Sequence, residues 1–94
     1  MSNRPLQPSF TSQFKKDVKR CVKAHLPMDE LKDIMDRLIR RTPLEAKHKD
    51  HQLTGNNQGF RDCHIRPNWL LIYTTTATEI TFTRTGTHAE LFGK

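Results

Sequence analysis

The sequence predicts an α+β fold, because two helical segments precede three short strands in a chain of 94 residues. Apolar side chains recur at the spacing of one helix face over residues 11–25 and again over residues 28–41. From residue 60 onward, three runs rich in β-branched and aromatic residues are separated by short turns. Short connections favour antiparallel pairing, so we expect the three strands to form an antiparallel meander. A chain of this length predicts one domain over residues 1–94, with a shallow surface site.

The N-terminal half is expected to hold one short strand and two helices. The strand is predicted at Leu6 to Phe10 and the first helix at Thr11 to His25, with an apolar face made by Phe14, Val18, Cys21 and Val22. The other face of this helix is basic and consists of Lys15, Lys16, Lys19, Arg20 and Lys23. A solvated surface and a contact with RNA explain this basic face equally well. After Pro27 the second helix runs to Arg40 and Arg41, and its predicted core positions are Met28, Leu31, Ile34, Met35, Leu38 and Ile39.

The C-terminal half is expected to hold a polar loop, three strands and a short helical turn. The loop spans Leu44 to Gln58, carries His51 and contains the turn residues Gly55-Asn56-Asn57. The strands are predicted at Phe60–Ile65, Trp69–Thr74 and Glu79–Thr83. In the first strand, alternation places Asp62 and His64 on one face and Cys63 and Ile65 on the other. The capping-box pattern Thr87-His88-Ala89-Glu90 predicts the helical turn, anchored by Leu91 and Phe92.

Composition restricts the compartment and the kind of partner. Lys and Arg outnumber Asp and Glu by 16 to 10, and this net charge of +6 favours a polyanionic partner. The sequence has no apolar run long enough to cross a bilayer and no signal-peptide pattern at its start, so we expect a cytoplasmic protein. Cys21 and Cys63 fall in a predicted helix and a predicted strand, which favours reduced, buried thiols. No zinc-binding motif is present, so neither a metal nor another cofactor is expected.

Three histidines in the C-terminal half stand beside residues suited to binding a phosphate. The stretches are Lys49-Asp50-His51, Arg61-Asp62-Cys63-His64 and Arg84-Thr85-Gly86-Thr87-His88. Histidine can give and take a proton near neutral pH, and arginine matches the geometry of a phosphate. RNA carries its own nucleophile, the 2'-hydroxyl, so an enzyme needs a base, an acid and a cation beside the phosphate. The pattern therefore predicts RNA cleavage without a metal, and it leaves open which histidine is the base and which the acid.

Five segments of the chain, residues 14–18, 49–53, 59–64, 67–73 and 84–93, stand in a characteristic order and spacing. In these segments, which span almost the whole chain, the sequence resembles the YafQ branch of the RelE family of bacterial toxins. The resemblance implies a RelE-like α+β fold with two helices packed on a small antiparallel sheet, and an endoribonuclease that cleaves messenger RNA in the ribosomal A site. It also implies an acidic cognate antitoxin, which forms a hetero-oligomer with the toxin and binds operator DNA.

The resemblance also implies roles for individual residues: catalysis by His51, His64 and His88, phosphate binding by Arg84, and a functional aromatic ring at Phe92. From the residues themselves we add Asp62 as an assistant to the histidines. The further candidates for contact with RNA or its phosphate are Lys49, Arg61, Asn68 and Trp69. Asn68 departs from the acid that YafQ-like proteins usually have there, and an amide cannot exchange a proton, so we expect it to hydrogen-bond RNA instead. For Trp69 and Phe92, packing in the core or at its rim is favoured over stacking on bases.

Other classes of protein remain as alternatives to an RNA-cleaving toxin. One is a ParE-like toxin that poisons DNA gyrase, but such a toxin has no need of this set of histidines. Another is a non-catalytic protein that binds RNA or the ribosome and blocks translation, which would explain the basic helix but not the histidines. A zinc site made by the same three histidines is disfavoured, because they lie on widely separated segments. His25 and His48 are expected to be ordinary surface residues.

Overall fold

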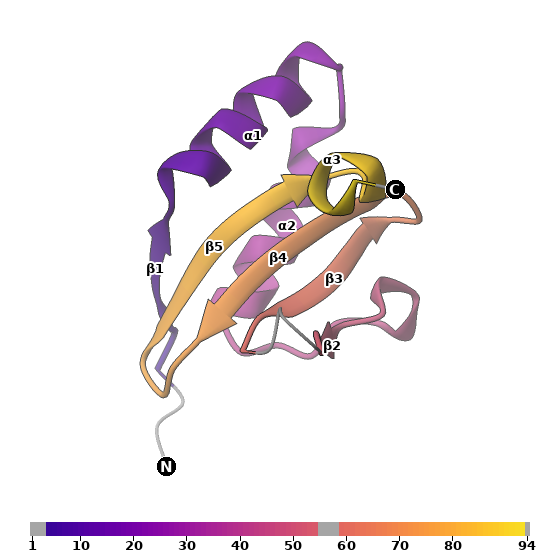
Figure 1. Cartoon of the computed structure of the whole chain (residues 1–94). Helices are drawn as coiled ribbons and strands as arrows, with labels where there is room; N and C mark the ends of the chain where they lie inside the picture. Colours follow the sequence, from indigo (N-terminus) through magenta and orange to yellow (C-terminus); the bar gives the residue numbers. More distant parts are fainter. Residues whose placement is uncertain (1–3, 55–58, 94) are drawn as a thin grey trace.

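The computed structural model describes residues 4–54 and 59–93, so the predicted turn at residues 55–57 lies outside the described residues. In chain order the elements are β1 (Gln7–Phe10), α1 (Ser12–Lys23), α2 (Met28–Ile39), a 3₁₀ turn (Ala46–His48), β2 (His51–Gln52), β3 (Arg61–Arg66), β4 (Trp69–Thr75), β5 (Glu79–Gly86) and α3 (His88–Phe92) (Figure 1). The predicted strands and helices are therefore confirmed in their order. Their bounds differ from the predicted ones by a few residues, most at the end of β5.

The sheet is mixed, with the strand order β1-β5-β4-β3-β2. The predicted antiparallel meander of β3, β4 and β5 is confirmed, whereas β1 adds to the edge of β5 in parallel. At the opposite edge, His51 and Gln52 form a two-residue strand that pairs antiparallel with β3. The sequence predicted only a loop there, because two residues are too few to show an alternating pattern. This pairing matters for function, since it places His51 directly opposite Asp62.

Helices α1 and α2 both pack on one face of the sheet. Their buried residues Phe14, Cys21, Leu31 and Ile34 share one core cluster with alternate residues of the strands, namely Cys63, Ile65, Leu71, Tyr73, Ile80 and Phe82. The remaining predicted core positions of α2 are partly buried against this cluster. Both cysteines are buried free thiols, as predicted. The helices therefore occupy the inner face and leave the opposite face of the sheet for α3 and the histidines.

One face of α1 differs from its prediction. Val22, predicted to lie in the core, has 53% of its surface exposed, while Asp17 is fully buried. The side chain of Thr11 caps the helix by accepting a hydrogen bond from the Phe14 backbone N–H at 2.9 Å. This start fixes which side chains point inward, and Asp17 lies one helical turn from both Phe14 and Cys21. A carboxylate therefore lies on the buried face between two core residues.

The predicted helical turn at the C-terminal end is confirmed. The Thr87 side chain accepts from the Glu90 backbone N–H at 3.1 Å, and the Glu90 side chain accepts from the Thr87 backbone N–H at 2.8 Å. This capping box fixes the direction in which α3 leaves β5, and His88 is the first residue of α3. Figure 1 shows α3 lying across the ends of β4 and β5. Among the described residues, no helix is long and apolar enough to span a bilayer.

Candidate active site

The sheet and α3 bring the three predicted histidines together. His51 on β2 lies opposite Asp62 on β3, and His64 follows two residues later on the same face of that strand. His88 at the start of α3 completes the group, with its ring 5.6 Å from the ring of His64 in an edge-on arrangement. Segments that are far apart in the sequence thus form one cluster of acid-base groups.

Asp62 lies beneath these histidines as a buried carboxyl group. Only 4% of the residue is exposed, and Oδ1 has no hydrogen-bond partner among the residues that the structure describes. Oδ2 lies 3.8 Å from Nε2 of His51. Burial raises the pKa of Asp62 above its ordinary value, although the nearby His51 and His88 act in the opposite direction. Asp62 thus shares the predicted face of β3 with His64. Its carboxyl group titrates at higher pH than that of an exposed aspartate.

His64 is half-buried, and its surroundings disfavour the charged imidazolium. Burial lowers the pKa of His64, and the neighbouring His88, Lys49 and His51 lower it further. Its backbone is held by His48, whose Nδ1 donates to the carbonyl oxygen of His64 at 2.7 Å. His48 was predicted to be a surface residue without a role. It is instead half-buried and ties the 3₁₀ turn to β3.

His51 and His88 are each oriented by an oxygen that accepts from Nδ1. Nδ1 of His51 donates to the carbonyl oxygen of Lys49 at 2.6 Å. Nδ1 of His88 donates to Oδ1 of Asn68 at 2.7 Å, and the same oxygen accepts from the His88 backbone N–H at 3.0 Å. A backbone N–H can only donate, which identifies the Asn68 atom as the amide oxygen. Asn68 therefore orients His88, a contact that the sequence did not predict, and both histidines keep Nε2 for other partners.

Arg84 lies inside β5, one residue beyond the predicted end of that strand. Its Nε donates to Oδ2 of Asp17 at 2.7 Å, and its Nη2 donates to Oδ1 at 3.3 Å. About a third of the Arg84 side chain remains exposed, whereas the Asp17 side chain is fully buried. Asp17 was not among the predicted functional residues. The available signal was a charged residue on the apolar face of α1, three residues after Phe14 and four before Cys21.

The two predicted aromatic contacts have different outcomes. Trp69 is only 2% exposed, and its Nε1 donates to Oγ1 of Thr85 at 3.0 Å. This burial favours the packing alternative for Trp69, because a buried indole ring offers no open face to a base. Phe92 is half-buried and lines a cavity of about 180 Å³ together with Arg84. The remaining lining residues of this cavity are Leu53, Phe60, Ile72, Thr83 and Leu91.

Arg61 and Lys49, the other predicted RNA contacts, lie near the edge formed by β2 and β3. Arg61 pairs with Asp50 at 3.3 Å and donates from Nε to the Tyr73 hydroxyl at 3.3 Å. That hydroxyl donates to Asp50 at 2.5 Å, so the arginine helps to hold the segment before β2 against the sheet. Lys49 is exposed, so a polyanion can reach it. Its positive charge also helps to lower the pKa of His64.

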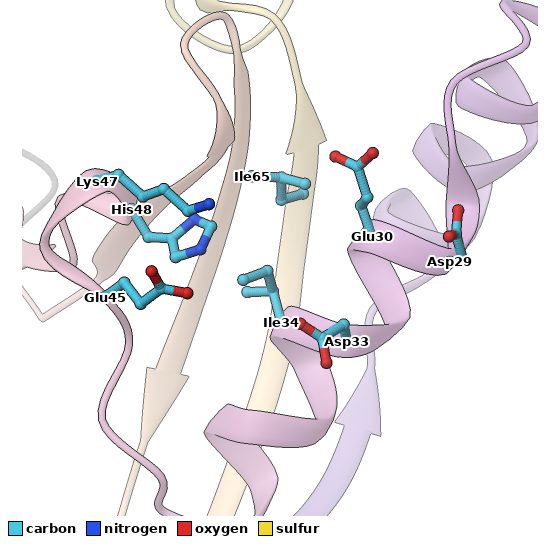
Figure 2. Close-up of a pocket in the computed structure, with 8 residues that line it drawn as sticks. All are labelled: Asp29, Glu30, Asp33, Ile34, Glu45, Lys47, His48 and Ile65. Carbon is cyan, nitrogen blue, oxygen red and sulfur yellow. The ribbon is translucent and has the colours of Figure 1, made fainter.

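A larger cavity lies apart from the cluster of His51, His64 and His88. It measures about 460 Å³ and separates α2 from the 3₁₀ turn, with His48 on its wall (Figure 2). Most of its polar lining is acidic, from Asp29, Glu30, Asp33 and Glu45. Over residues 4–54 and 59–93, no group of three histidine, cysteine or acidic side chains is placed to hold a metal ion. The partly exposed histidine cluster with Arg84 is thus the arrangement best suited to chemistry on a phosphate.

Comparison with protein families decides the classification. Residues 6–93 match the family described as "Bacterial toxin of type II toxin-antitoxin system, YafQ". The chain belongs to the YafQ toxin family. It is also 49% identical over 85 residues to the mRNA interferase toxin YafQ of Escherichia coli (strain K12), across 89% of this chain and 92% of that protein.

Solved structures of bacterial toxins share the fold. The toxin in the E. coli DinJ-YafQ toxin-antitoxin complex superimposes with a TM-score of 0.89 at 46% identity, covering 98% of this chain and 100% of that one. A metal-bound toxin from Helicobacter pylori superimposes with a TM-score of 0.86 at 35% identity, covering 93% of this chain and 99% of that one. The predicted RelE-like α+β fold is therefore confirmed for this member of the YafQ family.

Proposed function

We propose that this YafQ-family toxin is an mRNA interferase, an endoribonuclease that cleaves messenger RNA in the ribosomal A site. The observation that carries the proposal is the partly exposed cluster of His51, His64 and His88. The strand register places Arg84 on the same sheet face, in one row with Ile72 and Asp62. The similar toxin of E. coli is named as an mRNA interferase, which supports the same activity here. Acid-base groups beside a cation are what an attack by the RNA 2'-hydroxyl requires.

The proposed reaction uses the histidines for proton transfer and needs no metal. The 2'-hydroxyl loses a proton to a base and attacks the adjacent phosphorus, and an acid protonates the departing 5'-oxygen. The products are a 2',3'-cyclic phosphate and a 5'-hydroxyl. His64 suits the base, since its lowered pKa favours the neutral imidazole at pH 7. His51 or His88 then supplies the proton to the 5'-oxygen, and Asp62 assists by its charge beneath them.

Arg84 is proposed to balance the negative charge that builds on the phosphate during attack. Its Nε and Nη2 donate to Asp17, and its Nη1 has no hydrogen-bond partner in the part of the chain that the structure describes. The guanidinium can therefore donate to a phosphate oxygen without leaving Asp17. Phe92 lines the same cavity as Arg84, which supports a role for this aromatic ring beside the bound RNA.

Docking to the ribosome is proposed to use the exposed basic face of α1, formed by Lys15, Lys16, Lys19 and Lys23. Arg20, predicted to belong to this face, points instead toward Asp17, Thr85 and Glu90. Replacing the four lysines with glutamine should weaken ribosome binding and reduce its salt dependence, because each phosphate contact releases counterions. An unchanged dependence of binding on salt would mean that these lysines are only solvated and do not contact phosphates.

The proposed partner in the resting cell is an acidic antitoxin. The net charge of +6 favours such a partner, and the similar E. coli toxin has been solved in complex with DinJ. We propose that the antitoxin covers part of the basic face of α1, so that antitoxin and ribosome binding exclude each other. The resulting hetero-oligomer is also proposed to bind operator DNA. A small acidic reading frame next to the toxin gene would support this pairing.

Mapping the 5' ends of messenger RNA after brief induction tests the proposal. We expect cuts at a fixed position within codons, which would reveal both cleavage and its ribosomal setting. The fragments should carry a 5'-hydroxyl, and cleavage of a substrate that does not itself need metal should persist in EDTA. The His64→Ala variant is the matched control and should leave the transcripts intact. Fragments with 5'-phosphates would instead indicate a metal-dependent hydrolysis.

A further inference from the structure

We propose that Asp17 is a positioning residue for RNA cleavage, which holds the guanidinium of Arg84 in the orientation that meets the phosphate. The proposal rests on the proposed function, because Asp17 would act through the phosphate contact of Arg84. It assigns a role in the reaction to a side chain of α1, a helix that carries none of the acid-base groups. The supporting evidence is a chain of polar contacts that runs from α1 to β5 and on to α3.

The contact between Asp17 and Arg84 fixes two directions of the guanidinium. Both carboxylate oxygens accept from this arginine, Oδ2 from Nε at 2.7 Å and Oδ1 from Nη2 at 3.3 Å. A planar guanidinium that is held at two of its nitrogens keeps one orientation at the end of its long side chain. Its remaining N–H groups are directed away from the carboxylate. Because about a third of the side chain is exposed, an incoming phosphate can reach those groups.

Asp17 is itself held in place by further donors. Its carboxylate accepts from Nε2 of Gln13 at 3.1 Å, from Nη1 of Arg20 at 2.8 Å and from the Thr85 backbone N–H at 3.2 Å. Burial acts to raise the pKa of Asp17, but the hydrogen bonds from Arg84, Arg20, Gln13 and Thr85 outweigh it and the pKa lies below its ordinary value. The group that orients Arg84 is therefore a fixed anion at any pH near neutrality.

The same network extends to the helix that carries His88. Arg20 donates from Nη2 to the Thr85 carbonyl oxygen at 2.8 Å, and its Nε forms an ion pair with Glu90 at 2.8 Å. Glu90 is the acid of the capping box that starts α3. Gly86 leaves room for this pair, because a Cβ at that position would lie 2.5 Å from Nη2 of Arg20 and 2.8 Å from Oε1 of Glu90. One buried carboxylate thus connects the supports of both Arg84 and His88.

A purely structural role for Asp17 makes a different prediction from a positioning role. If Asp17 only joined α1 to the sheet, its loss would lower stability and leave the rate of the folded protein unchanged. If it positions Arg84, its loss should lower the rate of the folded protein, and only when Arg84 is present. The coupling between the two residues is therefore the quantity to measure.

The experiment is a double-mutant cycle on single-turnover cleavage of ribosome-bound messenger RNA at saturating toxin. The variants are Asp17→Asn, Arg84→Ala and the pair together, with folding checked by circular dichroism. We expect Asp17→Asn to slow cleavage about 10-fold to 100-fold without weakening ribosome binding, because the lost interaction acts in the transition state. The double variant should be no slower than Arg84→Ala. Asp36→Asn is the matched control, since Asp36 also binds an arginine Nε but lies exposed on α2.

The outcomes separate this proposal from the proposed function. A normal rate in Asp17→Asn together with a slow Arg84→Ala would overturn the positioning role alone. The positioning role would also be overturned if the two substitutions slowed cleavage independently, so that the double variant showed the product of the two single losses in rate. A normal rate in Arg84→Ala would contradict the phosphate contact and with it both proposals. If Asp17→Asn does not fold, Asp17→Glu keeps the charge but shifts the carboxylate by one methylene. The Glu variant should fold and cleave slowly, and a parental rate would overturn the role.

Discussion

Two buried aspartates, Asp17 and Asp62, behave in opposite ways on the two sides of the site. Asp17 accepts hydrogen bonds from two arginines, a glutamine and a backbone N–H, and its pKa is lowered although burial acts to raise it. For Asp62 burial dominates: one oxygen has no hydrogen-bond partner among the described residues, and its pKa is raised. Burial alone therefore does not determine the state of a carboxyl group; the donors around it do.

The comparison separates a fixed part of the site from a titrating part. On the Arg84 side, charges are paired in a network tied to the core, which keeps them constant near neutral pH. On the histidine side, His64 and Asp62 have pKa values shifted toward their neutral forms, and the rings are held mostly by single hydrogen bonds. A reaction that needs one steady cation and several mobile protons is served by this division.

The largest expected effect comes from removing the proton carriers. His51→Ala, His64→Ala and His88→Ala should each slow cleavage by about 10²–10⁴-fold, the usual contribution of a general acid or base. Stability should change little, because these rings lie on the surface side of the sheet. Single-turnover rates and thermal unfolding measure the two effects. His25→Asn is the matched control, since His25 is exposed and its φ of 60° is one that asparagine tolerates. Parental rates in all three alanine variants would refute the mechanism.

The next largest effect concerns stability on the Arg84 side. Asp17→Asn should lower the free energy of unfolding by about 2 to 3 kcal/mol at pH 7, as expected for the loss of charge-assisted hydrogen bonds. The folded pKa lies below the ordinary 3.8, so this stabilisation is present above pH 3.8 and is lost as the pH falls through the folded pKa. Urea unfolding of parent and variant should therefore converge in acid. A difference that did not shrink in acid would show that Asp17 is not held as an anion.

Asp62 should give a smaller effect of opposite sign. Because its folded pKa is raised above 3.8, ionising Asp62 destabilises the fold, and this penalty grows as the pH rises from 3.8 to the folded pKa. Asp62→Asn should therefore stabilise the protein at pH 7 by about 1 kcal/mol, and the gain should vanish below pH 3.8. The same urea series measures it, with Asp36→Asn as the exposed control. Equal stability of parent and variant at every pH would contradict the raised pKa.

Much of the fold could be predicted because it depends on local patterns. Helix periodicity identified Leu31 and Ile34 as core residues, and the capping box at Thr87 was read directly from the residue types. The parallel pairing of β1 with β5 was not predicted, since it joins segments at opposite ends of the chain. The two-residue strand at His51 was missed because it is defined by its partner in space and not by its own sequence.

The site was predictable in its residue types and less so in its contacts. Proximity to basic residues identified the three histidines, and the structure does bring them together. Trp69 packs in the core cluster with Leu71 and Tyr73, in line with the packing alternative that the sequence favoured. Asp17 was missed because the pairing with Arg84 links α1 to β5 across most of the chain. The local signal, a charged residue on the apolar face of α1, does not identify Arg84 as its partner.

The smallest expected effect comes from adding a third carboxylate to the site, one that differs in its surroundings from both Asp17 and Asp62. Asn68→Asp would place a carboxylate where Nδ1 and the backbone N–H of His88 already donate. Unlike Asp62 it would be exposed and hydrogen-bonded, so it should ionise and raise the pKa of His88 by favouring the imidazolium. We expect a gain in cleavage rate of about threefold or less, with the pH profile extended to higher pH because His88 keeps its proton longer. A single-turnover pH series on parent and variant measures both quantities. A rate that fell at every pH would mean that the added charge repels the phosphate, and that position 68 only orients His88.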